Sequence, residues 1–279
     1  MSIPTPVNSG LFAACSRLCL VLVVSLTPCA ALGAQEHHDD HDHDHLHFSH
    51  PVVTESPSPD TKLRFDYLGT RTSGLGGIHE SIFRVEGEYG FNDNLSLAIV
   101  TPFVSRTAPQ SERESGLGDI ELSLKAASLA FGELGLLIGG GLAAALPTGS
   151  DAKGIGSSHL VELAPFLDAG YKLERVELVG FATLSSTVNR RTGEAAEREL
   201  AFDVSALTRV SSRIEGMIEL TSARALVGTE SGSQRTFLAP GLKIYPFPSR
   251  KLMLGASAEF GVGAVKTTRA LLVSAFYHF

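Results

Sequence analysis

Apolar and polar residues alternate with a period of two along most of this chain, the pattern of β-strands that have one apolar face. Alternating segments follow one another from Lys62 to Phe279, and turns rich in Gly, Asn, Asp, Ser and Pro separate them. The predicted strands cover residues 62–71, 78–91, 94–105, 117–130, 134–147, 158–172, 176–188, 198–210, 213–227, 235–247, 251–263 and 269–279. The pattern therefore predicts an all-β chain of about 12 strands.

The two faces of each predicted strand differ in chemistry. In the segment 78–91 an apolar row, Phe83, Val85, Gly87, Tyr89 and Phe91, opposes a charged row, Arg84, Glu86 and Glu88. Short turns, such as 92–93 and 211–212, alternate with longer ones, such as 105–117 and 228–234. Apolar rows toward lipid, and turns that are short at one end only, are features of membrane barrels. We therefore expect a transmembrane antiparallel up-and-down β-barrel over residues 61–279. The alternative is a soluble β-sandwich, in which the charged rows would lie outside.

The last predicted strand carries an apolar row that reaches the final residue: Leu271, Val273, Ala275, Tyr277 and Phe279. It resembles the C-terminal closing strand of bacterial outer-membrane proteins, in which a final Phe on such a row is the usual assembly signal. The resemblance implies that Tyr277 and Phe279 form this signal. It also implies a Gram-negative outer-membrane location, with the barrel-assembly machinery, outer-membrane lipids and lipopolysaccharide as partners.

Three short motifs follow one another between residues 116 and 156. Residues 116–125 read GLGDIELSLK, residues 146–150 read LPTGS, and residues 154–156 read GIG. Together they resemble the outer-membrane transporter family named after a protein of the phenol-degradation meta-pathway. Ser150 stands where that family often has Asp, and Ile155 stands where it has Leu. The resemblance implies a porin-like barrel without naming its cargo, and the glycines themselves are explained as turn residues that adopt positive φ.

The N-terminal part of the chain has a different composition. Residues 1–34 are predicted to be a secretory signal peptide, because an apolar core after Arg17 is too short for a membrane span and small residues follow it. All three cysteines, Cys15, Cys19 and Cys29, lie in this segment, so cleavage would leave no thiol. A lipoprotein signal at Cys29 is the alternative, although Leu26-Thr27-Pro28 matches it poorly. Residues 35–60 are predicted to be a disordered His/Asp-rich tract followed by a Pro/Ser linker.

The tract alternates imidazoles and carboxylates. Its candidate metal ligands are His37, His38, Asp39, Asp40, His41, Asp42, His43, Asp44, His45, His47 and His50. Neutral imidazole suits Zn, Ni, Co and Cu, so the composition indicates a flexible site for divalent transition metal rather than one fixed four-ligand centre. The alternative is a solvated acidic spacer. No cofactor is required.

Charged rows opposite the apolar rows are predicted to line the lumen. The candidate lining residues are Asp66, Arg84, Glu86, Glu88, Asp119, Glu121, Lys125, Glu162, Asp168, Asp203, Arg209, Glu215, Glu219 and Glu259, with Arg64 and Lys243 as further bases. Acidic groups outnumber bases, which favours cations in an open pore. The same groups could instead pair and fill a closed barrel.

These patterns favour an outer-membrane porin-like transport protein that is linked to divalent transition-metal handling, with both termini periplasmic. The alternatives are a channel for small hydrophobic or aromatic molecules and a non-transporting structural barrel. An enzyme is not expected, because His79, His159 and His278 are scattered and no G-x-S-x-G motif occurs. The net charge of −7 argues against nucleic-acid binding. The oligomeric state is open.

Overall fold

The computed structural model describes residues 46–73, 77–107 and 112–279. The predicted signal peptide and the tract up to His45 lie outside these residues. No helix in the described ranges is long and apolar enough to cross a membrane.

Thirteen strands and three short 3₁₀ turns make up the described chain. The strands are β1 (Lys62–Thr72), β2 (Ile78–Asn92), β3 (Leu95–Thr107), β4 (Glu114–Leu117), β5 (Ile120–Phe131), β6 (Leu136–Leu146), β7 (Glu162–Lys172), β8 (Val176–Thr187), β9 (Arg198–Arg209), β10 (Ile214–Val227), β11 (Gln234–Ile244), β12 (Leu252–Val262) and β13 (Thr268–His278). The 3₁₀ turns are η1 (Gly132–Leu134), η2 (Asp151–Lys153) and η3 (Gly263–Val265).

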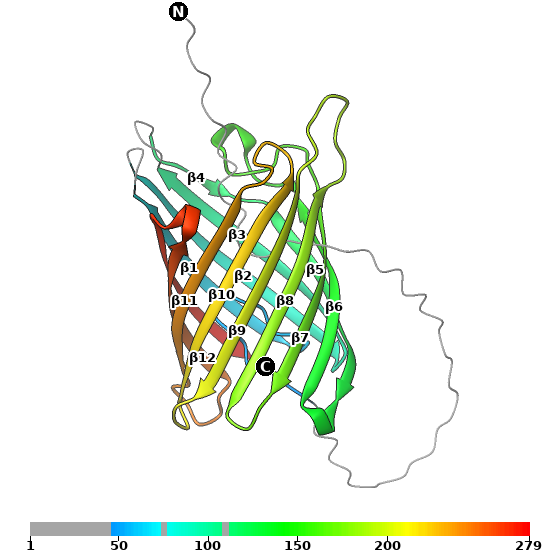
Figure 1. Cartoon of the computed structure of the whole chain (residues 1–279), viewed down its shortest axis with the longest axis vertical. Helices are drawn as coiled ribbons and strands as arrows, with labels where there is room; N and C mark the ends of the chain where they lie inside the picture. The colour runs from blue at the N-terminus through cyan, green and yellow to red at the C-terminus, as the bar shows by residue number, and fades with distance from the viewer. Residues whose placement is uncertain (1–45, 74–76, 108–111) are drawn as a thin grey trace, which may run out of the picture.

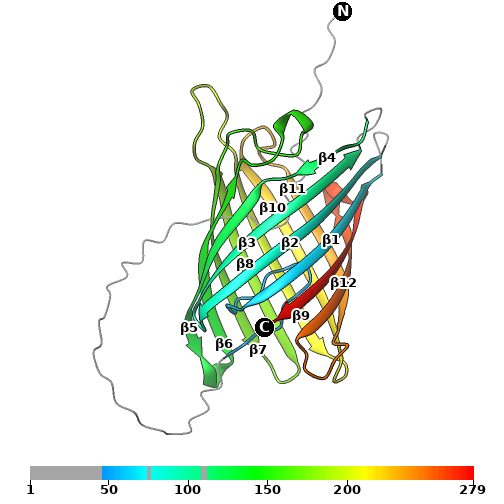
Figure 2. The same cartoon turned by 180° about the vertical axis from the view of Figure 1, so that it is seen from behind.

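All strands except β4 form one closed antiparallel ring (Figures 1 and 2). Each pairs with its neighbours in the sequence, and β1 pairs with β13 from Lys62↔His278 to Thr72↔Thr268, which closes the ring. The all-β barrel of about twelve strands is therefore confirmed. Because β1 begins where β13 ends, both lie at the end that carries the short turns, here called the short-turn end; the opposite end is the loop end.

Two predicted strand starts were wrong, and one loop cluster explains both. The strand expected over 117–130 begins only at Ile120, as β5, with β4 in the loop expected over 105–117, and the strand expected from residue 158 begins only at Glu162. Between β4 and β5, the Asp119 carboxylate accepts hydrogen bonds from the backbone N–H groups of Gly149 and Ser157, at 2.9 Å each. These bonds draw the three family-like motifs together at the loop end.

Most glycines of these motifs do not adopt positive φ; at Gly156, the absence of a side chain lets two backbone segments pass close to each other. Of the five, only Gly154 has positive φ (63°). A Cβ on Gly156 would lie 2.3 Å from the carbonyl carbon of Gly149, so the two backbones meet where no side chain fits. The turn interpretation therefore holds only for Gly154.

The outside of the barrel is apolar and the inside is charged. Exposed large side chains alternate along the strands, as in Phe83, Tyr89 and Phe91 of β2, whereas Glu86 and Glu88 of the same strand are buried in the lumen. A soluble sandwich would require the reverse arrangement, so that alternative does not describe this chain.

Residues 46–61, here called the lumen segment, run inside the barrel near the short-turn end (Figure 2). Every even-numbered side chain from 48 to 58 is buried: Phe48, His50, Val52, Thr54, Ser56 and Ser58. The prediction of a disordered Pro/Ser linker was therefore wrong for 51–60. The reason is that the lumen wall supplies hydrogen-bonding and apolar partners, which offset the entropy of ordering the segment.

Gly170 of β7 makes room for the lumen segment, because a Cβ there would lie 2.7 Å from the Phe48 ring. We expect Gly170→Ala to force Phe48 out of place and weaken docking of the segment by about 1–3 kcal/mol, the usual effect of overpacking. Faster hydrogen exchange at the amides of residues 52–54 would report this. Gly180→Ala is the control, since a Cβ at Gly180 meets no atom within 4 Å. Equal exchange in both variants would contradict the prediction.

Candidate functional site

A cavity of about 1090 Å³ occupies the barrel above the lumen segment. It is bounded by Val53 and Glu55 of the segment at one extreme and by the loop 229–235 and η3 at the other. Eleven acidic and five basic residues line it, so the lumen carries an excess of negative charge. Apolar side chains line part of the wall, including the stacked rings of Phe166 and Phe181, whose centroids are 4.7 Å apart.

Glu219 of β10 holds the centre of the lumen segment. Its fully buried carboxylate accepts hydrogen bonds from three successive backbone N–H groups, those of Val52, Val53 and Thr54, at 2.8–3.2 Å. The Ser205 hydroxyl donates to the same carboxylate at 2.9 Å. Because the donors are aimed at a charged acceptor away from water, these are strong bonds.

Two cations of the barrel wall bind the carbonyls of the segment. Arg64 of β1 donates to the Val52 oxygen at 2.6 Å, and Lys243 of β11 donates to the His50 oxygen at 2.9 Å. Lys243 also pairs with Glu215 at 2.9 Å. Together with Glu219, these groups bind the N–H groups of residues 52–54 and the carbonyls of His50 and Val52.

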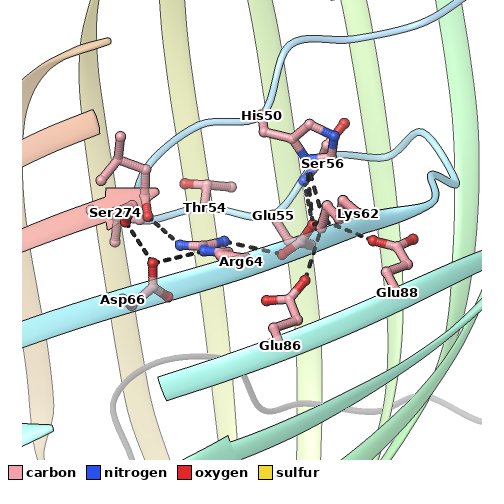
Figure 3. Close-up of polar contacts among 12 residues, drawn as sticks. His50, Thr54, Glu55, Ser56, Lys62, Arg64, Asp66, Glu86, Glu88 and Ser274 are labelled. Carbon is pink, nitrogen blue, oxygen red and sulfur yellow. Dashed lines mark hydrogen bonds and ion pairs between the residues drawn. The ribbon is translucent and has the colours of Figure 1, made fainter. Parts of the chain in front are cut away.

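Lys62 lies at the centre of a buried ion-pair cluster (Figure 3). Its Nζ is 2.7 Å from Glu55, 3.2 Å from Glu86 and 2.7 Å from Glu88. Lys125 of β5 adds contacts of 3.4 Å to Glu55 and 3.3 Å to Glu88. Burial acts to raise the pKa of Glu55, but Lys62 and Lys125 override it and hold this pKa well below its usual range. Glu55 is thereby fixed as an anion that ties the lumen segment to the wall.

A second cluster lies beside the seam between β1 and β13 (Figure 3). The Asp66 carboxylate accepts from Arg64 at 2.9 Å, from Arg84 at 2.8 Å and from the Ser274 hydroxyl at 2.6 Å. Since Ser274 belongs to β13, this cluster joins both sides of the seam to Arg64, which in turn holds the segment.

His47, His50 and Asp60 meet where the lumen segment reaches the short-turn end. The Nε2 atoms of His47 and His50 lie 3.0 Å and 2.5 Å from the same Asp60 oxygen. The hydrogen bond to Asp60 raises the pKa of His47, and, against the effect of burial, the bonds to both imidazoles lower the pKa of Asp60 far below its usual value. His278 of β13 is close by, with its ring centroid 5.1 Å from that of His50.

The structure distributes the predicted lumen residues over three environments. Those that line the cavity are Arg84, Glu86, Glu88, Asp119, Glu121, Lys125, Glu162, Asp203 and Glu259. Those buried deeper in the barrel are Asp66, Asp168, Glu215 and Glu219. Arg209 differs, because it ends β9 at the short-turn end with 61% of its side chain exposed, 3.9 Å from Glu215. It is a rim residue rather than a lining residue.

Of the predicted metal ligands, only His47 and His50 lie within the described residues. Sequence reasoning missed their partner Asp60 and also Glu55, because both belong to the segment interpreted as a disordered linker. It also missed Lys62, which follows this segment at the start of the first predicted strand. The run Pro51-Val52-Val53 and the regular spacing of Phe48 and His50 were the available signals.

Tyr277 and Phe279 lie on the outer surface as an edge-to-face pair with centroids 5.2 Å apart. Ser158 and His159 lie in the turn that precedes β7 rather than on a strand. The Ser158 hydroxyl is 3.5 Å from His159 Nδ1, longer than the roughly 2.6–3.2 Å at which a nucleophile meets its base.

Comparison with family models and with curated proteins gives no match. Solved structures do match. An outer membrane channel from Pseudomonas putida F1 superposes with a TM-score of 0.59 at 17% identity, covering 78% of this chain and 95% of that one. The NanC porin gives 0.53 at 10% identity, covering 77% and 100%. The translocator domain of the autotransporter NalP from Neisseria meningitidis gives 0.53 at 11% identity, covering 78% and 88%. At these identities the likeness shows a shared barrel fold.

Proposed function

We propose that this protein is a porin-like channel of the bacterial outer membrane that favours cations. The observation that carries the proposal is the acidic cavity inside a closed barrel whose outer surface is apolar. Rings of fixed carboxylates in a pore raise the local concentration of cations and repel anions. The motif resemblance and the likeness to outer-membrane channels support the same location, with the lipids, lipopolysaccharide and assembly machinery of that membrane as partners and both termini periplasmic. Enzymatic activity is not part of the proposal.

The finer proposal is that transport is linked to divalent transition metal through the His/Asp tract. The tract joins the lumen segment directly, so an ion bound there would lie beside the short-turn mouth. The stacked Phe166 and Phe181 in the cavity wall favour a second candidate, a channel for small aromatic molecules. Replacing His37, His38, His41, His43 and His45 by Asn should weaken the metal response of the current if metal is the cargo, and should leave transport unchanged if the cargo is aromatic.

Selectivity tests the channel directly. Glu121 and Glu162 lie on either side of Ala145 in register, so their carboxylates form one level of the cavity wall. We expect Glu121→Gln with Glu162→Gln to lower the cation-to-anion permeability ratio by roughly twofold or more, because two fixed charges are lost. Reversal potentials in a KCl gradient across a planar bilayer measure this ratio, with Glu133→Gln on the short-turn surface as control. Anion selectivity in the unchanged protein would overturn the proposal. The proposal would also be overturned if no current flowed through the unchanged protein and none flowed after the lumen segment had been released.

A further inference from the structure

We propose that His47, His50 and Asp60 bind one divalent transition-metal ion, and that this ion fastens the lumen segment inside the barrel. Each residue offers one ligand atom, and these atoms lie within 4.8 Å of one another. Two imidazoles and one carboxylate are a donor set that suits Zn²⁺, Co²⁺ and Ni²⁺. The site differs from the flexible tract expected from composition, because it is a fixed arrangement that includes an Asp thirteen residues beyond His47.

The geometry accommodates an ion in place of the present hydrogen bonds. Both imidazoles already direct Nε2 to one carboxylate, at 3.0 Å and 2.5 Å, so an ion with bonds of about 2.0–2.2 Å can enter when these atoms separate slightly. The other ring nitrogen of His50 faces Glu55 at 3.8 Å, and Lys62 Nζ lies 3.4 Å from it. A carboxylate near the second nitrogen orients a metal-bound imidazole, and Glu55, Glu86 and Glu88 surround the lysine charge.

The site spans the two ends of the lumen segment. His47 and His50 precede the residues held by Glu219, and Asp60 lies two residues before the start of β1. An ion that binds all three therefore closes the segment into a loop at its base and stabilises the docked form by mass action. His47 is half exposed, and so the ion has access from the short-turn end. Any effect of the bound ion on transport rests on the proposed channel function, whereas metal binding and fastening of the segment do not.

The test uses the full chain in which five of the seven tract histidines, His37, His38, His41, His43 and His45, are replaced by Asn, while His47 and His50 are kept. Co²⁺ absorption and Zn²⁺ competition with a chelating dye should show one site per chain. Adding His47→Asn should weaken binding at least about tenfold, as should adding Asp60→Asn, because ligand loss removes a direct bond. Adding His79→Asn, on β2, should change nothing. No binding after the tract change, or equal binding with and without His47, would overturn the assignment.

Fastening is measured separately by hydrogen exchange at the amides of Val52, Val53 and Thr54. At Zn²⁺ tenfold above its dissociation constant these amides should exchange about tenfold more slowly, since only the docked segment binds the ion. Unchanged exchange despite binding would overturn the fastening. Because His47 is exposed, His47→Asn should leave the lumen segment docked. Hydrogen exchange of this variant without metal checks that it does. A channel that lacks cation selectivity would leave both results standing, so the two proposals fail independently.

Discussion

Glu219→Gln is expected to release the lumen segment and to raise the ionic current through the barrel. The substitution keeps the size of the side chain but turns one acceptor oxygen into a donor that faces the N–H groups of residues 52–54. The loss should be about 3 kcal/mol, as expected for hydrogen bonds to a charged group, and so the undocked fraction should rise roughly a hundredfold. Single-channel recording measures the current, and hydrogen exchange at the same amides measures undocking.

The matched control is Glu80→Gln. Glu80 also lies in the lumen, but it occupies the loop end of β2, where it pairs in register with Arg106 rather than with the segment. A rise in current that occurs equally in both variants would mean that loss of charge, not release of the segment, changes the conductance. No rise in Glu219→Gln, with exchange accelerated, would show that the segment does not obstruct the pore.

Lys62→Met should cause the largest loss of stability of any single substitution considered for this chain. Lys62 is fully buried among Glu55, Glu86 and Glu88, so its removal leaves three carboxylates close together with Lys125 and Arg64 as the nearby remaining cations. Removing one partner from a buried ion pair typically costs about 3–5 kcal/mol. Urea unfolding of the refolded barrel, followed by tryptic protection and circular dichroism, should show a lower midpoint.

Lys266→Met is the control, since Lys266 is exposed near η3. The double variant Lys62→Met with Glu88→Gln should regain part of the lost stability, because one of the uncompensated charges is removed. If the double variant were less stable than Lys62→Met alone, the loss would come from packing and not from charge.

The barrel could be predicted from sequence because its determinants are local. Alternation of side chains along each strand fixes which face meets the lumen, and turn residues fix where strands end, so β2, β8 and β9 begin where they were predicted. The late starts of β5 and β7 could not be predicted in this way. They depend on Asp119, which bonds backbone groups about thirty and forty residues later.

The interior depends on pairings that no local pattern encodes. Residues 51–60 contain three prolines and two serines, a composition that favours an extended, solvated chain. Their burial is decided by Glu219 and Lys243, which are far away in the sequence and whose charges appeared to be ordinary lumen lining. The candidate ligand Asp60 was hidden for the same reason, since its histidine partners become neighbours only when the segment folds back inside the barrel.

The placement of the lumen segment also sets an order of events for assembly. Ser49 meets Glu177 across 128 residues, Val52 meets Glu219 across 167 and His50 meets Lys243 across 193. Contacts so distant in sequence form late, because the loops that they close must first lose their freedom. The lumen segment thus reaches its site only after β8 to β11 are in place, and the adjacent strand β1 pairs with β13 at a late stage as well. Insertion of the segment and closure of the ring are therefore coupled steps, and a nascent barrel held open at this seam would still expose the acidic wall that the segment later covers.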